Sequence, residues 1–169
     1  KSMSELPNAP LAKQIPKNLT IHDDVRVDEF YWLNDRENPE VIDYLNKEND
    51  YYNTHTAHTK DFQKSLFEEM KSRIKEDDSS VPYKYNGYWY ITKFEKGKDY
   101  PIYIRKKESL SASEELLFDC NEMAKGHSYF RLVGLSISPN NNMISYGVDT
   151  TGRRQYKLQI KDLKTNTVF

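Results

Sequence analysis

The sequence predicts a mixed fold in which an N-terminal α-helical segment is followed by antiparallel β-sheet. Between about residues 38 and 76, the apolar residues recur at the three- and four-residue spacing of helices. A short polar run at 76–80 then ends this pattern, and the rest of the chain alternates at strand spacing between turn residues. We therefore place a boundary between residues 76 and 77.

An apparent internal repeat is the third observation behind this prediction. Residues 86–106 read as two strands joined by a glycine-containing turn, and residues 141–161 repeat the pattern after roughly 55 residues, a period within the range of β-propeller blades. The alignment pairs Asn86 with Asn141 and Gly97 with Gly152. After one inserted residue, it pairs Tyr100 with Tyr156, Ile102 with Leu158 and Ile104 with Ile160. Because β-hairpins resemble one another in composition, an ordinary sandwich or barrel remains an alternative.

The first 36 residues lack a clear periodicity. Residues 1–20 contain three prolines and few large apolar groups, which predicts an extended arm lying on another surface. Within 26–36, four large apolar residues stand together, namely Phe30, Tyr31, Trp32 and Leu33. One strand face or helix stripe cannot bury all four, so we expect this segment to insert into a neighbouring body.

Two helices follow. Asn38 is a good N-cap, Pro39 suits the first helical position, and Glu40 favours the positive end of the helix dipole. Thr59 can cap a second helix that continues to about Lys75. We expect the two helices to form a hairpin whose apolar stripes exceed what they can bury in each other.

Eight short strands are predicted in the remainder, an arrangement that argues against a parallel βαβ sheet. They cover 81–85, 87–94, 100–106, 116–119, 132–138, 143–149, 155–162 and a start at Thr167. The strand at 87–94 carries large apolar groups on both faces, as expected between neighbouring blades or in the centre of a sandwich. The strand at 155–162 alternates polar and apolar residues, as expected nearer an outer rim.

Charge and composition exclude several classes. The 25 basic and 26 acidic residues give a net charge of −1, and the absence of a basic block argues against nucleic-acid binding. No apolar run approaches the roughly 18 residues of a membrane-spanning helix. The single Cys120 excludes an intrachain disulfide and weakly favours a cytoplasmic location; a periplasmic one stays open because the sequence begins with Lys rather than Met.

Ser136 is the nearest candidate for a nucleophile. It lies in Gly134-Leu135-Ser136-Ile137-Ser138, which lacks the closing glycine of a nucleophile elbow, precedes a strand rather than a helix, and has no histidine after it. Gly126-His127-Ser128 fails for the same reasons. We therefore expect both serines to be structural.

The remaining candidates are pairs whose simpler interpretation is structural. His55 and His58 lack a third metal ligand nearby, and the acidic pairs Asp23-Asp24 and Asp77-Asp78 are interpreted as solvated turns. Arg153-Arg154 is expected to form a hairpin-turn salt bridge rather than to bind a substrate carboxylate, and Cys120 to fill space in a loop. We predict no catalytic, cofactor-binding or metal-binding residue in this chain.

Three long stretches resemble the N-terminal part of the prolyl oligopeptidase family, most closely its oligopeptidase B branch. They are RVDEFYWLNDRENPEVIDYLNKEN at 26–49, FEEMKSRIKEDDSSVPYKYNGYWY at 67–90 and TTGRRQYKLQIKDL at 150–163. The resemblance implies that residues 1–76 accompany an α/β-hydrolase catalytic domain, and that residues 77–169 form blade one and most of blade two of a seven-bladed propeller.

The resemblance also implies a function for the parent protein. The family consists of serine peptidases that cleave short peptides, and the oligopeptidase B branch prefers bonds after Lys or Arg. The propeller would restrict substrate access, and the implied partners are a peptide, the catalytic domain and the remaining blades. The rival interpretation is a non-catalytic β-propeller or β-sandwich interaction module.

Overall fold

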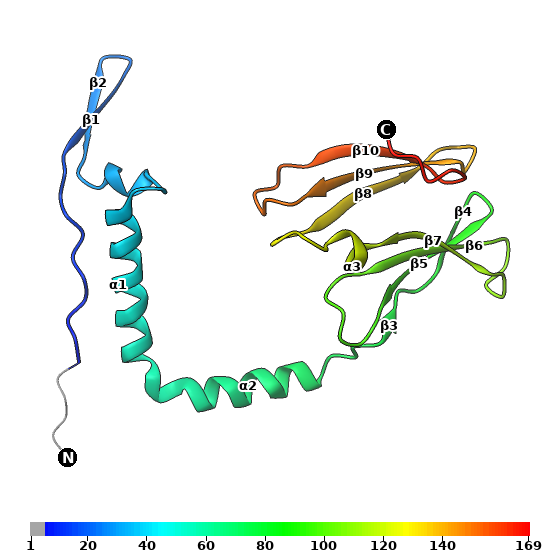
Figure 1. The fold of residues 1–169 in the computed structure, drawn as a ribbon, viewed down its shortest axis with the longest axis horizontal. Coiled ribbons are helices and arrows are strands. Elements are labelled where there is room, and N and C mark those ends of the chain that lie inside the picture. Colours follow the sequence, from blue (N-terminus) through cyan, green and yellow to red (C-terminus); the bar gives the residue numbers. More distant parts are fainter. Residues whose placement is uncertain (1–5) are drawn as a thin grey trace. The chain divides into compact units, whose positions relative to one another are not determined.

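The computed structural model describes residues 6–169 and divides the chain into two compact units, which meet between Arg73 and Ile74. The first unit contains a two-stranded hairpin and two α-helices, and the second contains two antiparallel sheets (Figure 1). Mixed helical and antiparallel β-structure is therefore confirmed. Within residues 6–169, no helix is both long and apolar enough to cross a membrane.

The first unit begins with an extended segment that leads into a hairpin. The predicted arm at 1–20 is extended from residue 6 to 16, while residues 1–5 lie outside the described part. Strand β1 (Lys17–Ile21) then pairs with β2 (Asp24–Asp28), which the sequence analysis missed. The turn is made by His22 and Asp23, both with positive φ, a pattern typical of two-residue hairpin turns.

The aromatic cluster at 30–33 folds into the short 3-10 helix η1 (Tyr31–Asn34). Trp32 Nε1 donates to the carbonyl of Lys13 at 2.8 Å, and the Trp32 ring meets Tyr44 edge-on at 6.4 Å between centroids. The Lys17 ammonium lies 3.7 Å from the Tyr31 ring centre. These contacts join the extended segment, the hairpin and the first helix.

Helix α1 (Pro39–His55) begins as predicted. The Asn38 side chain accepts a hydrogen bond from the Glu40 amide at 2.9 Å, and Pro39 occupies the first turn. After the 3-10 turn η2 (Ala57–Thr59), helix α2 runs over Lys60–Ser72. Thr59 is its N-cap residue, but its side chain does not make the capping hydrogen bond.

The predicted helical hairpin is wrong. Helix α2 continues away from α1 instead of folding back alongside it (Figure 1). No residue of α2 is buried within its unit, and its apolar face stays exposed, comprising Phe62, Leu66, Phe67 and Met70. The amphipathic pattern correctly predicted a helix but not its packing partner.

The second unit begins with a five-stranded antiparallel sheet. Its order is β3-β5-β6-β7, and β4 pairs with β5 beside β3. The strands are β3 (Asp78–Ser79), β4 (Tyr83–Tyr85), β5 (Tyr88–Phe94), β6 (Ile102–Lys107) and β7 (Glu114–Asp119). The short helix α3 (Cys120–Met123) follows, capped by the Asp119 side chain, which accepts from the Asn121 amide.

The other sheet has the order β10-β9-β8, all antiparallel. Its strands are β8 (Arg131–Ile137), β9 (Met143–Asp149) and β10 (Lys157–Asp162), and an isolated bridge joins Lys161 to Val168 near the predicted start at Thr167. The repeat proposed from the sequence thus matches β5 and β6 of the first sheet with β9 and β10 of the second. Both Gly97 and Gly152 have positive φ, as their matched turns require.

Candidate functional site: the cavity between the two sheets

The two sheets of the second unit share one apolar core. Phe118 of β7 contacts Tyr146 of β9 with ring centroids 4.5 Å apart, and buried residues of both sheets form one cluster. This cluster comprises Tyr90, Leu117, Phe118, Cys120, Phe130, Leu132, Ile144 and Tyr146. Lys161 of β10 also reaches the first sheet, where its ammonium donates to the Leu117 carbonyl at 3.2 Å.

Two asparagines join the turns at one end of the sheets. Asn86 Nδ2 donates to the Pro139 carbonyl at 2.7 Å and to Asn141 Oδ1 at 3.2 Å, while Asn141 Nδ2 donates to the Asn86 carbonyl at 3.0 Å. These are the two residues that the repeat alignment matched. Equivalent turns of the two sheets therefore bond to each other.

Arg105 of β6 reinforces this junction from inside the core. Its guanidinium is buried, and Nε donates to Glu115 Oε2 at 2.8 Å while Nη1 donates to the Asn141 carbonyl at 2.9 Å. The guanidinium carbon lies 4.1 Å from the centre of the Tyr88 ring. One cation thus links two strands of the first sheet to the turn between β8 and β9.

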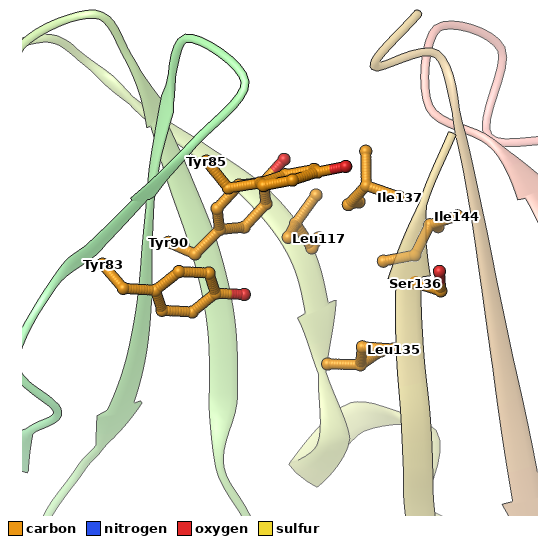
Figure 2. A pocket seen from close by; sticks show the side chains of 8 residues that line it. All are labelled: Tyr83, Tyr85, Tyr90, Leu117, Leu135, Ser136, Ile137 and Ile144. Atoms are coloured by element: carbon orange, nitrogen blue, oxygen red, sulfur yellow. The ribbon is translucent and has the colours of Figure 1, made fainter. Parts of the chain in front are cut away.

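A cavity of about 260 Å³ lies between the sheets. Figure 2 shows aromatic side chains extending from β4 and β5 toward β8. The lining residues are Tyr83, Tyr85, Tyr90, Leu117, Leu135, Ser136, Ile137 and Ile144. Tyr83 and Tyr85 are 62% and 51% exposed, whereas Tyr90 and Ile144 are only 5% and 1% exposed. The cavity therefore has an exposed rim and a buried floor.

The hydroxyl of Tyr90 is the unusual polar group of this cavity. It is buried and makes no hydrogen bond within residues 6–169. Arg105 lies opposite Tyr90 on β6, but its Nε donates to Glu115 and its Nη1 to the Asn141 carbonyl. Burial raises the pKa of the Tyr90 phenol, and the Arg105 guanidinium opposes this shift through both a weak polar contact with the hydroxyl, outside hydrogen-bond geometry, and its positive charge. A buried hydroxyl without a hydrogen bond lowers the stability of the fold, so a group that hydrogen-bonds to Tyr90 would be favoured here.

Ser136, the nucleophile candidate of the sequence analysis, lies on the wall of this cavity. It pairs with Ser145 in the β8–β9 ladder, in a strand rather than at a strand-to-helix turn. Among the described residues, the cavity lining contains no His, Asp, Glu or Lys that could serve as a base. His127 and Ser128 lie elsewhere, in the turn that follows α3.

The histidine and carboxylate pairs also occupy structural positions. His55 Nδ1 donates to the Tyr51 carbonyl at 2.9 Å, and its ring lies tilted against the Tyr51 ring with centroids 4.0 Å apart. Asp77 accepts from the Lys96 amide, whereas Asp78 accepts from the Ser79 amide within β3 and pairs with Lys75 at 3.6 Å, so the two carboxylates have different partners. Within residues 6–169, no group of three or more His, Cys, Asp or Glu side chains is placed to hold a metal ion.

The loop carrying Arg153 and Arg154 is organised by Asp149, not by the predicted salt bridge. Within residues 6–169, neither guanidinium forms an ion pair; instead, the Asp149 carboxylate accepts from the amides of Thr151, Gly152 and Arg154. Burial alone would raise the pKa of Asp149, but these hydrogen bonds hold the pKa below its usual value of 3.8. The sequence analysis missed this buried carboxylate.

Cys120 begins helix α3 instead of lying in a loop. Its thiol is buried in the shared core, and burial, with a smaller contribution from Asp119, raises the pKa of the thiol to about 11. The thiol therefore stays protonated at neutral pH and fills space as predicted.

The tyrosine-lined cavity was not predicted from the sequence. The tyrosines at 83, 85 and 90 were visible as a cluster in the sequence, but their position opposite β8 depends on how the two sheets pack.

The second unit is a β-domain whose small antiparallel sheets face each other through a common core, which is the arrangement of neighbouring propeller blades, and also of a β-sandwich. A family model described as "Prolyl oligopeptidase, N-terminal beta-propeller domain" matches residues 10–169. The chain therefore belongs to the prolyl oligopeptidase family and is the N-terminal part of a member. This confirms the family resemblance drawn from the sequence.

Curated relatives include two bacterial peptidases. The chain is 38% identical over 165 residues to dipeptidyl aminopeptidase BI of Pseudoxanthomonas mexicana, with 88% of this chain and 23% of that protein covered. It is 34% identical over 165 residues to protease 2 of Moraxella lacunata, with 95% and 24% covered. The chain thus spans about a quarter of the length of these relatives.

Solved structures of oligopeptidase B share the fold. The Leishmania major enzyme has a TM-score of 0.80 and 28% identity, covering 95% of this chain and 25% of that one. The Trypanosoma brucei enzyme, solved in a closed form with covalently bound antipain, has a TM-score of 0.81 and 26% identity with the same coverage.

Proposed function

We propose that the chain is the N-terminal portion of a serine oligopeptidase that hydrolyses peptide bonds in short peptides after Lys or Arg. The observation that carries the proposal is the agreement between the family match over residues 10–169 and the oligopeptidase B structures, which cover 95% of the chain. The covalent antipain complex of the Trypanosoma relative supports a covalent peptidase mechanism in the parent protein.

In this proposal, residues 77–169 are the first blade and most of the second blade of a seven-bladed propeller. The shared core and the Asn86–Asn141 contact support their interpretation as consecutive blades. Residues 1–76 pack against the catalytic domain, which would cover the exposed apolar face of α2. The complete propeller restricts access to short peptides.

The chain itself supplies none of the catalytic groups. Ser136 lies in a strand, and its cavity offers no base among the described residues. The catalytic serine, acid and base would come from the remaining part of the protein. The proposal places the protein in the cytoplasm. The single Cys120 supports this location weakly, and cell fractionation can test it.

The decisive experiment uses the full-length protein and fluorogenic peptide amides with a blocked amino terminus. Hydrolysis after Arg or Lys at rates at least about a hundredfold above those after Ala or Pro is expected, a difference of about 2.7 kcal/mol in transition-state binding. Residues 1–169 alone should show no turnover. Equal cleavage after all four residues, or turnover by the fragment that Ser136→Ala abolishes, contradicts the proposal.

The 38% identity to dipeptidyl aminopeptidase BI favours a second candidate, removal of dipeptides from a free amino terminus. The same substrates with free and blocked amino termini separate the two activities. A requirement for the free amine supports the aminopeptidase, because only an exopeptidase must recognise that charge. A non-catalytic interaction module would cleave neither set.

A further inference from the structure

The cavity between the two sheets is not used by the proposed peptidase function. Tyr90, one of its lining residues, is only 5% exposed. The Tyr90 hydroxyl makes no hydrogen bond within residues 6–169. A native core seldom leaves such a group unsatisfied. A cavity with an unpaired hydroxyl at its floor is a site where a bound polar group would gain a hydrogen bond.

The walls of the cavity define the chemistry of that partner. On one side stand three phenol rings, of which Tyr83 and Tyr90 are stacked with centroids 5.3 Å apart and an interplanar angle of 21°. On the other side, Leu135, Ile137 and Ile144 present aliphatic groups (Figure 2). Among the described residues, no charged side chain lines the cavity, so it favours an uncharged ligand.

The size of the cavity limits the ligand to about one ring system. An engineered apolar cavity of about 150 Å³ in another protein binds benzene. The cavity here measures about 260 Å³, which leaves room for a ring with a polar substituent. Aromatic ligands also gain from stacked or edge-on contacts with tyrosine rings at about 4.5–7 Å.

We propose that this cavity binds a small uncharged aromatic group with one hydrogen-bonding substituent, of the phenol or indole class, which pairs with the Tyr90 hydroxyl. The ring lies between the tyrosines of β4 and β5 and the aliphatic side chains of β8 and β9. Such a group can arrive as a free molecule or as the side chain of a peptide. The proposal does not require the parent protein to be a peptidase.

Titration calorimetry of the full-length protein with p-cresol and with toluene tests the proposal. Tyr90→Phe, which keeps the ring, should weaken p-cresol binding about two- to tenfold, the contribution of one hydrogen bond. Toluene, which lacks the hydroxyl, should bind the wild type and Tyr90→Phe equally. Tyr129→Phe is the matched control, because Tyr129 lies against Gly152 outside the cavity and should leave p-cresol binding unchanged.

A second variant separates cavity binding from adsorption elsewhere. Leu135 is 36% exposed at the rim, so Leu135→Trp should be tolerated while filling the cavity and abolishing saturable p-cresol binding. N-acetyl-tyrosine amide distinguishes the sources: its binding supports a peptide side chain, and its exclusion while p-cresol binds supports a free molecule. No saturable p-cresol binding to the wild type, or equal affinity for folded wild type and Leu135→Trp, overturns the proposal.

Discussion

Asn86 and Asn141 each perform two tasks in the β-domain. Both adopt positive φ, 46° and 60°, a conformation that asparagine tolerates better than most residues that carry a side chain. Each also donates from its side-chain amide across the junction between the sheets. The repeat alignment matched these two residues, but their direct contact with each other became visible only in the structure.

Replacing either asparagine with glycine separates these two tasks, because glycine keeps the positive φ and removes the amide. We expect Asn141→Gly to lower the free energy of unfolding by about 1 kcal/mol, the net value of about one hydrogen bond. Urea unfolding followed by circular dichroism measures this change.

The control is Asn166→Gly, because Asn166 has φ 59° in the turn after β10 and is exposed. It should change the free energy of unfolding by less than about 0.5 kcal/mol. In the double variant, Asn86→Gly and Asn141→Gly should be non-additive by about 0.5 kcal/mol or more. Strict additivity would show that the two side chains do not stabilise each other.

Helix α2 shows how an amphipathic pattern can predict an element without its partner. Its apolar residues follow helical spacing, yet Phe62, Leu66 and Met70 are 69%, 42% and 51% exposed. A helix of 13 residues with no packed face is marginal in water, so its stability depends on a surface that covers this stripe. The proposed catalytic domain would be that surface.

This assignment predicts a difference between two glutamine variants of the full-length protein. Leu66→Gln should lower its thermal stability by the equivalent of about 1.5–3 kcal/mol, the value of burying a leucine side chain. Lys64→Gln introduces the same residue on the opposite side of the helix and should cost less than about 0.5 kcal/mol. Differential scanning calorimetry measures both, and equal effects would argue against a covered apolar face.

Sequence patterns predicted the longer elements and missed most of the shortest ones. Strand β9 was predicted at its observed bounds because alternate residues such as Ile144 and Tyr146 are buried. The β1–β2 hairpin was missed although Val25 and Val27 alternate with polar residues, because each strand has only five residues and shows the alternation over too short a run. The short strand β3 and the one-turn helix α3 are too brief to show a period.

Contacts between elements were harder to predict than the elements themselves. Arg105 lay within a predicted strand, but nothing local shows that it would be buried and bonded to the Asn141 carbonyl. The cavity has the same origin, because Tyr83 and Ser136 meet only through the packing of two sheets. Sequence periodicity reports which face of an element is apolar, and tertiary packing decides what covers it.

Burial is distributed unevenly over the whole chain. Among residues 6–73, Val41 is the one buried residue, whereas the β-domain contains a cluster of eight buried side chains. Hydrophobic burial is the main favourable contribution to folding, so the two units should differ sharply in local stability. The most protected backbone is expected in β9, where Ile144, Tyr146 and Asp149 are at most 2% exposed.

Hydrogen exchange of the 169-residue chain measures this difference directly. Amides of β9 should exchange at least about a hundredfold more slowly than those of α2, because α2 can unfold without exposing a core. In the full-length protein, protection of α2 should rise toward that of β9 if the catalytic domain covers its apolar face, whereas protection of β9 should change little. Equal protection of α2 and β9 in the 169-residue chain would mean that the first unit has a stabilising contact beyond those described. Unchanged protection of α2 in the full-length protein would show that the catalytic domain does not cover it.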